Sequence, residues 1–412
     1  MSSADPKPFP MSEREFVGLM AMLQGLQALA IDVMLPGIGL IAQDLNVTDP
    51  NDRQLVIGVF LICSGIGSLF PGALADRYGR RPVLFGCLAG YVLFSAAAAL
   101  ATEFTFLLIL RGFAGFAASG MLVTSGAVIR DRYSGDRMAR TQSLVGMVFM
   151  VVPMAAPSLG QAVLAVASWR WIFAIMAALA AIVAIWTFLR LPETLHPEFR
   201  QPIRIGTIAT NMKAGLTHRS AMGYIFGMAL IQGALFGYIN SSQQLVAEHF
   251  GAGAMFPLIF GGMAVAMAVA NLTNSRIVER FGARRVSHTA VLVYIALAGL
   301  QLALALQDHQ TIWQFIPVMT LNLCMMGFIG ANFSSIALQP FARIAGAAAS
   351  VQAFTRLLIG ATLGTFIGHS YDGTARPLAL ALIAAGILAL LLVLYSERGR
   401  LFRRLHGQVE QA

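Results

Sequence analysis

The sequence contains one short basic turn twice, as GALADRYGRRPV at residues 72–83 and as NSRIVERFGARRV at residues 274–286. When Gly79 is aligned with Gly282, which lies 203 residues further on, an acid, an arginine and an aromatic residue precede each glycine in the same order. Basic turns alone are common between apolar segments. A repeated acid–arginine–aromatic–glycine order at half the chain length instead indicates an internal repeat.

Each turn follows a long apolar run, and such runs recur along the whole chain. The 412 residues are 57% hydrophobic and only 11% charged, with a mean hydropathy of +0.72, whereas a soluble protein needs more charge on its surface. An apolar run of about 18 residues or more can cross a bilayer as a helix. The sequence therefore predicts an all-α polytopic membrane protein with twelve spans, at 15–41, 54–75, 82–101, 104–129, 141–166, 169–190, 221–247, 252–275, 285–306, 311–336, 347–369 and 375–396.

The net charge of +9 is distributed unevenly between the predicted loops. Arginines cluster after the second, fourth, sixth and eighth spans and at the C-terminal end, whereas the alternate connections carry mostly acids. Because cytoplasmic loops of membrane proteins carry an excess of Lys and Arg, we expect both termini in the cytoplasm. The basic pI then reports topology and gives no reason to expect a nucleic-acid partner.

The two turns occupy equivalent places in two blocks of six spans. Since six is an even number, both blocks have the same orientation, as in parallel repeats related by an axis along the membrane normal. We expect two six-helix bundles around a central cavity, formed by residues 1–190 and 221–396. A proline-containing cytoplasmic linker, 191–220, joins them, and a cytoplasmic tail follows at 397–412.

GALADRYGRRPVL resembles the loop signature of the major facilitator superfamily, and the resemblance extends over nearly the whole chain. It implies two bundles that rock about a central cavity, with the loop latching the cytoplasmic ends of helices. By position, the latch residues are Gly72, Asp76, Arg77, Gly79 and Arg80.

Asp131, in IRDRYSGDR, is the expected ion-pair partner of Arg80. An arginine beside a carboxylate stabilises one docked state of the two helices. The second copy of the turn has Ala283 where the first has Arg80, so we expect a weaker latch there.

Two opposite charges lie deep in the first bundle. Asp32 in span 1 and Arg111 in span 4 lie roughly 24 Å and 27 Å from the cytoplasmic face at 1.5 Å per residue. Ionisable residues inside a membrane are costly and usually functional, which favours proton coupling; a static ion pair between helices is the alternative. Pro36 cannot donate to the Asp32 carbonyl, which predicts a bend there.

Three segments sharpen the resemblance to drug:proton antiporters of the bicyclomycin/chloramphenicol-resistance (Bcr/CflA) type. They are IDVMLPGIGLIAQDL in span 1, RGFAGFAASG in span 4 and GMVFMVVPMAAPSLGQAV in span 5. The last is similar to the antiporter motif, carried here by Gly146, Pro153, Pro157 and Gly160, and it departs from the motif at Ala156 and Gln161. The resemblance implies proton-coupled export. The simpler alternative is that the small residues of these segments only allow tight helix packing.

Polar and aromatic residues within the spans are candidates for the substrate cavity, because polar side chains at membrane depth should face water and not lipid. We expect the cavity to be lined by Gln24, Gln27, Phe149, Phe236, Tyr238, Asn240, Gln244, Asn322 and Gln352. Arg356 in span 11 either snorkels to the cytoplasmic face or faces the cavity, where it would favour an anionic or zwitterionic substrate.

Together these features predict a monomeric, proton-driven antiporter of the bacterial inner membrane that exports small amphipathic or hydrophobic compounds, antibiotics among them. A symporter or uniporter of a metabolite on the same fold is the alternative. The sequence has no phosphate-binding G-x-x-x-x-G-K-[ST] loop, so the proton gradient, and no cofactor, is the expected energy source. No catalytic constellation or metal-type Cys spacing lies within the spans, so we expect neither an enzyme nor a metal site.

Overall fold

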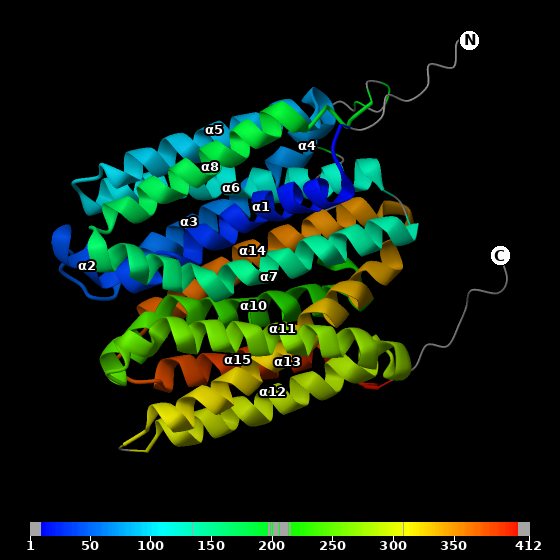
Figure 1. Cartoon of the computed structure of the whole chain (residues 1–412). Coiled ribbons are helices and arrows are strands. Elements are labelled where there is room, and N and C mark those ends of the chain that lie inside the picture. Colours follow the sequence, from blue (N-terminus) through cyan, green and yellow to red (C-terminus); the bar gives the residue numbers. More distant parts are fainter. Residues whose placement is uncertain are drawn as a thin grey trace, which may run out of the picture.

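The structure is a computed structural model that describes residues 10–133, 135–196, 198, 200, 206, 213, 216–307 and 309–402. These residues form helices and no strands (Figure 1). Eleven of the described helices are long and apolar enough to cross a membrane, and a bent helix pair makes a twelfth span. The predicted fold class is therefore confirmed.

In the first half of the chain, the described residues form the α-helices α1 to α8. They are α1 (Glu13–Asp32), α2 (Ile38–Asp44), α3 (Leu55–Gly67), α4 (Phe70–Tyr78), α5 (Arg80–Ala99), α6 (Phe104–Arg132), α7 (Gly135–Val166) and α8 (Arg170–Arg190). The second half contains α10 (Arg219–Gln243), α11 (Phe256–Phe281), α12 (Ala283–Ala305), α13 (Ile312–Leu338), α14 (Ala345–His369) and α15 (Arg376–Ser396). Half of the predicted linker 191–220 and the last ten residues of the predicted tail 397–412 lie outside the described residues.

Two of the predicted spans are interrupted, each at a proline. The first breaks after Asp32, and a 3₁₀ turn at Leu35–Gly37 leads into α2. The second consists of α3, with its preceding turn, and α4, which are bent by 45° at their junction. Pro71 lies in the first turn of α4 and has no N–H to donate back to the carbonyl of Gly67, so the helix cannot continue straight through.

Helices α1, α3, α5, α6, α7 and α8 pack against one another, and α10 to α15 form a second packed group. Figure 1 shows the two groups on opposite sides, with α7, α14 and α10 in the middle of the molecule. The groups meet mainly where α3 crosses α14 and where α7 crosses α11. We call these groups the first and second bundles.

The bundles have two chemically different ends. The arginine-rich end carries the α4–α5 and α11–α12 turns, and the opposite end carries α2 and the loop between α14 and α15.

Glycines bring the bundles together toward the opposite end. A Cβ at Gly65 of α3 would lie 2.9 Å from the Leu358 backbone of α14, and one at Gly58 would lie 2.4 Å from Thr365. Only glycine permits this approach.

Candidate functional site

Asp32 is the last residue of α1, at the point where the first span breaks. Its side chain is 4% exposed and has no hydrogen-bond or ion-pair partner among the described residues. The predicted bend at Pro36 is present, because the segment that follows Asp32 leaves the α-helical path. The structure therefore holds a buried, unpartnered carboxyl group beside a helix break.

Arg111 of α6 is also buried but forms no ion pair with Asp32. Its Nε donates to the carbonyl of Val56 and its Nη2 to the carbonyl of Ala30, both at 3.0 Å. The guanidinium also lies 4.2 Å from the centre of the Phe60 ring, in cation–π range. Arg111 thus joins α6 to α1 and α3 one half-turn before Asp32, and the static Asp32–Arg111 ion pair is absent.

Gly160 of α7 packs directly against the break in α1. A Cβ at this position would lie 1.9 Å from the carbonyl oxygen of Val33 and 3.1 Å from Pro36. No Cβ atom fits at such a distance. The glycine therefore allows α7 to approach the backbone of Val33, the residue next to Asp32, this closely. The sequence motif of span 5 and the acid of span 1 therefore meet in space.

The rest of that motif lies along α7, which runs without interruption through Pro153 and Pro157. Gly146 has open space where a Cβ would be. On the other side of α7, the Met154 carbonyl would lie 2.9 Å from a Cβ at Gly261 of α11, in the second bundle. Helix α7 thus contacts both the Asp32 break and the other bundle.

A bidentate ion pair closes the opposite end between the two bundles. Arg53, at the start of the second span, places its Nη1 and Nη2 each 2.8 Å from an oxygen of Glu248, which follows α10. The Arg53 side chain is only 10% exposed, whereas that of Glu248 is 46% exposed. Sequence reasoning did not identify this pair, because its partners are 195 residues apart and neither lies in a motif.

Further polar contacts surround this pair. Gln54 is hydrogen-bonded to Gln244, and Asn51 donates to the carbonyl of Tyr371 at 2.9 Å. Together with a contact between His369 and Asp52, these hydrogen bonds and the ion pair join the two bundles at this end. The molecule is therefore closed at the opposite end.

Asp49, Asp52 and His369 lie at the same junction. Their ligand atoms all lie within 4.8 Å of one another, and they form the one such group of possible metal ligands among the described residues. Asp49 and His369 are exposed.

The α4–α5 turn at the arginine-rich end holds the first bundle together. Arg80 is buried and forms ion pairs with Asp76 and with Asp131 of α6, the latter at 2.9 Å. Gly79 adopts a positive φ of 109°, which a residue with a side chain rarely adopts. Arg77 instead stacks over its neighbour Tyr78 at the surface.

Glu193, directly after α8, completes this turn. Its carboxylate accepts hydrogen bonds from the backbone N–H groups of Arg80 and Arg81 at 2.9 and 3.1 Å, at the N-terminus of α5. A carboxylate is favoured there by the helix dipole and the free N–H groups. Gly72 of α4 lies next to Val123 of α6, whose side chain would be 3.6 Å from a Cβ at this position, an ordinary van der Waals contact. The sequence contained no signal for Glu193 other than its place at the start of the linker.

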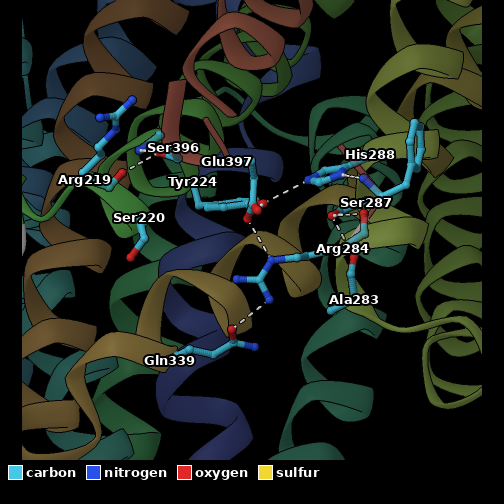
Figure 2. Close-up of polar contacts among 12 residues, drawn as sticks. Arg219, Ser220, Tyr224, Ala283, Arg284, Ser287, His288, Gln339, Ser396 and Glu397 are labelled. Atoms are coloured by element: carbon cyan, nitrogen blue, oxygen red, sulfur yellow. Dashed lines mark hydrogen bonds and ion pairs between the residues drawn. The ribbon is translucent and has the colours of Figure 1, made fainter. Parts of the chain in front are cut away.

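The second copy of the turn forms a different latch (Figure 2). Its Arg284 donates to Glu397 at 2.8 Å, and the Tyr224 hydroxyl donates to the same carboxylate at 2.7 Å. His288 lies 2.9 Å from the Tyr224 oxygen. Although Ala283 replaces the counterpart of Arg80, the next arginine pairs with the carboxylate of Glu397, which directly follows α15 and whose side chain is 12% exposed. The predicted weakness of this turn is therefore offset by contacts that the repeat did not reveal.

A cavity of about 320 Å³ lies in the second bundle between α10, α11, α13 and α14. Methionine and aliphatic side chains form most of its wall, and its polar lining comes from Gln232, Asn271, Ser334 and Arg356. The sequence singled out Arg356 because it is a charged residue within a predicted span. It gave no reason to select Gln232, Asn271 and Ser334, because single polar residues in apolar helices usually form hydrogen bonds within their own helix.

The nine predicted cavity residues do not line this cavity. Gln352 lies immediately behind it and accepts a hydrogen bond from Ser334. Gln244 instead belongs to the closure at the opposite end. Asn322 is fully buried in α13, and its amide faces the backbone carbonyl of Tyr294 and the backbone N–H of Ala298 in α12. A buried amide needs such polar backbone groups as hydrogen-bond partners.

The other predicted residues are buried or partly buried. Tyr238 donates to the sulfur of Met263, and Gln27 donates to Ser64 at 2.6 Å. The remaining members of the predicted set, Gln24, Asn240, Phe236 and Phe149, line no part of the cavity either.

The family model described as Major Facilitator Superfamily matches residues 20–365. The chain belongs to the Major Facilitator Superfamily.

Relatives of this superfamily member carry names that refer to drug resistance. A bicyclomycin resistance protein homolog of Haemophilus influenzae is 28% identical over 91% of this chain and 94% of its own. The multidrug resistance protein MdtL of Klebsiella pneumoniae is 28% identical over 88% of this chain and 91% of its own.

A solved structure also has the same fold. It is a bacterial homolog of the human lysosomal transporter Spinster, described as inward-facing and unoccupied, with a TM-score of 0.69, 14% identity and 96% coverage of both chains. As a superfamily member, the chain is a multi-pass membrane transporter of small molecules.

Proposed function

We propose that this protein is a proton-coupled antiporter that exports small amphipathic compounds, antibiotics among them, across the bacterial inner membrane. The observation that carries the proposal is Asp32, a buried and unpartnered carboxyl group at the break of the first span. The names of its relatives, which refer to bicyclomycin and multidrug resistance, support the substrate class.

In the proposed cycle, Asp32 carries the proton. An ionised carboxylate without a counter-ion is costly in a low-dielectric interior, so its affinity for a proton depends on how well water reaches it. Alternating access changes that hydration, because the bundles rock apart at one end and together at the other. Gly160 places α7 against the residue after Asp32, so movement of α7 changes the surroundings of the carboxyl group.

In this proposal the arginine-rich end faces the cytoplasm, as the positive-inside rule requires. The structure, closed at the opposite end, then corresponds to a state that takes substrate from the cytoplasm. The Arg53–Glu248 pair must break when the substrate leaves on the other side. No cofactor takes part, and the protein works as a monomer because one chain contains both bundles.

The proposal is tested in inverted membrane vesicles with an acid interior and a pH-sensitive dye. Addition of a transported compound should dissipate the proton gradient in the wild type and not in Asp32→Asn. Glu103→Gln is the matched control, because it neutralises an exposed carboxylate that forms no hydrogen bond or ion pair among the described residues.

Dissipation by the control at the wild-type rate is expected. If a transported compound moves protons equally in wild type and Asp32→Asn, Asp32 is not the coupling group. If instead substrate accumulates on the cytoplasmic side with inward proton flow, the protein is a symporter.

A further inference from the structure

Arg356 lies well inside the candidate membrane span Ala348–His369. It is eleven residues after the start of α14 at Ala345 and thirteen before its end at His369. At 1.5 Å per residue, the nearer helix end is about 17 Å away, which exceeds the reach of an arginine side chain. In this structure the Arg356 side chain lines the cavity of the second bundle.

The guanidinium of Arg356 has no hydrogen-bond or ion-pair partner among the described residues. The three arginines that are most deeply buried among the described residues, Arg53, Arg80 and Arg111, all have partners. Arg111 binds two carbonyl groups, and Arg53 and Arg80 each bind carboxylates. No acidic residue lines the cavity around Arg356. A membrane protein rarely retains such a charge in its interior without a use for it.

The other polar groups of the cavity could bind the same ligand. The amides of Gln232 and Asn271 make no hydrogen bond to the described residues and lie in the cavity lining. The Ser334 hydroxyl lies in the same lining and donates to Gln352. The rest of the wall is apolar and includes Met228, which can adapt to varied shapes.

From these observations we propose that the cavity binds small amphipathic anions, with the Arg356 guanidinium holding a carboxylate and the methionine-rich wall holding the apolar part. Such a pair is a charge-assisted and potentially bidentate contact. Arg356 is then the specificity-determining residue of the transporter. The inference rests on the proposed export function for its physiological meaning, but the binding itself does not depend on proton coupling.

The charge of the substrate has a consequence for energetics. Export of a monovalent anion moves one more negative charge out of the cell than export of its neutral amide, for the same number of protons exchanged. A cytoplasm-negative membrane potential therefore drives export of the carboxylate more strongly than that of the amide. The exchange is balanced because substrate leaves intact and only protons enter.

The test measures binding to the purified full-length protein in phosphatidylcholine nanodiscs without a proton gradient. The probes are the fluorescent carboxylate N-dansylglycine and its neutral amide, which differ only in the group that Arg356 is proposed to bind. The wild type should bind the carboxylate at least about tenfold more tightly than the amide. Arg356→Gln should lose this preference but still bind the amide, which also shows that its cavity is folded.

Three further variants sharpen the result. Arg356→Lys keeps the charge and should keep part of the preference. Arg276→Gln removes an exposed arginine of α11 and should keep all of it. Asn271→Asp, which is nearly isosteric, places a carboxylate in the same cavity and should abolish the preference even if Arg356→Gln fails to fold.

The proposal is overturned if the wild type does not bind the carboxylate, if it binds both probes equally, or if Arg356→Gln keeps the wild-type ratio. Failure of the proposed export function has a different outcome. The wild type and Asp32→Asn would then both prefer the carboxylate in nanodiscs, while neither probe moved protons in vesicles.

Discussion

The closure at the opposite end predicts the effect of removing one charge. Glu248→Gln leaves the guanidinium of Arg53, which is 10% exposed, without its counter-ion. A charge-assisted hydrogen-bonded pair contributes about 1.5–3 kcal/mol, and the 46% exposure of Glu248 places this pair at the lower end. The closed state should therefore lose about 1.5 kcal/mol relative to the state open at that end. This shifts the equilibrium between them about tenfold.

The shift can be measured as a distance between the bundles. Spin labels at the exposed positions Thr48 and Ala254 lie on different bundles at the opposite end. The three native cysteines are first replaced by alanine. Electron–electron double resonance should then show a larger long-distance population in Glu248→Gln than in the parent protein. The charge-swapped double variant Arg53→Glu/Glu248→Arg should return the population toward that of the parent.

A matched control separates closure from general stability. Arg190 and Glu15 form an equivalent bidentate ion pair, with distances of 2.7 and 2.8 Å, but both residues belong to the first bundle. Glu15→Gln should therefore leave the distance between the labels unchanged. An unchanged distance distribution in Glu248→Gln, or an equal change in both variants, would refute the conclusion that Arg53 and Glu248 hold this end closed.

Two further pairs of substitutions test the packing of the first bundle. Gly160→Ala should abolish substrate-driven proton movement in vesicles, because its Cβ would meet the Val33 carbonyl at 1.9 Å, whereas Gly146→Ala has open space and should retain wild-type activity. Arg80→Gln should destabilise the protein by about 2–3 kcal/mol, since two carboxylates lose their counter-ion, and Arg77→Gln, at the surface, by less than about 0.5 kcal/mol. Thermal unfolding in detergent measures this difference, and equal midpoints for the two arginine variants would contradict it.

The sequence predicted the fold well because membrane spans follow from local properties. Each span needs a long apolar run, and the repeated turn around Gly79 and Gly282 revealed the relation between the halves. The helix breaks after Asp32 and before Pro71 are harder to predict from the sequence. A proline indicates where a hydrogen bond is lost, but whether the helix bends or separates depends on what packs against it.

The sequence indicated only some of the contacts that the structure shows around the candidate site, and the reason is again physical. The sequence singled out Asp32, Arg111 and Arg80 as candidates because a charged residue within an apolar segment or a motif is informative alone. The absence of an Asp32–Arg111 pair could not be foreseen, since similar depth in a bundle does not fix which way two side chains point. The Arg53–Glu248 pair joins residues far apart in the chain, and no local pattern specifies such a contact.

Helix α7 provides the physical connection between the proposed proton site and the movement of the bundles. Through Gly160 it contacts the backbone beside Asp32, and through the Met154 carbonyl it contacts Gly261 of the second bundle. Since protein interiors are close-packed, a shift at one contact cannot be absorbed without a response at the other. In the proposed cycle, a change of charge at Asp32 therefore alters the α7–α11 crossing directly. This accounts for the glycines on α7 and α11 at these two contacts, because a side chain at either would separate the helices.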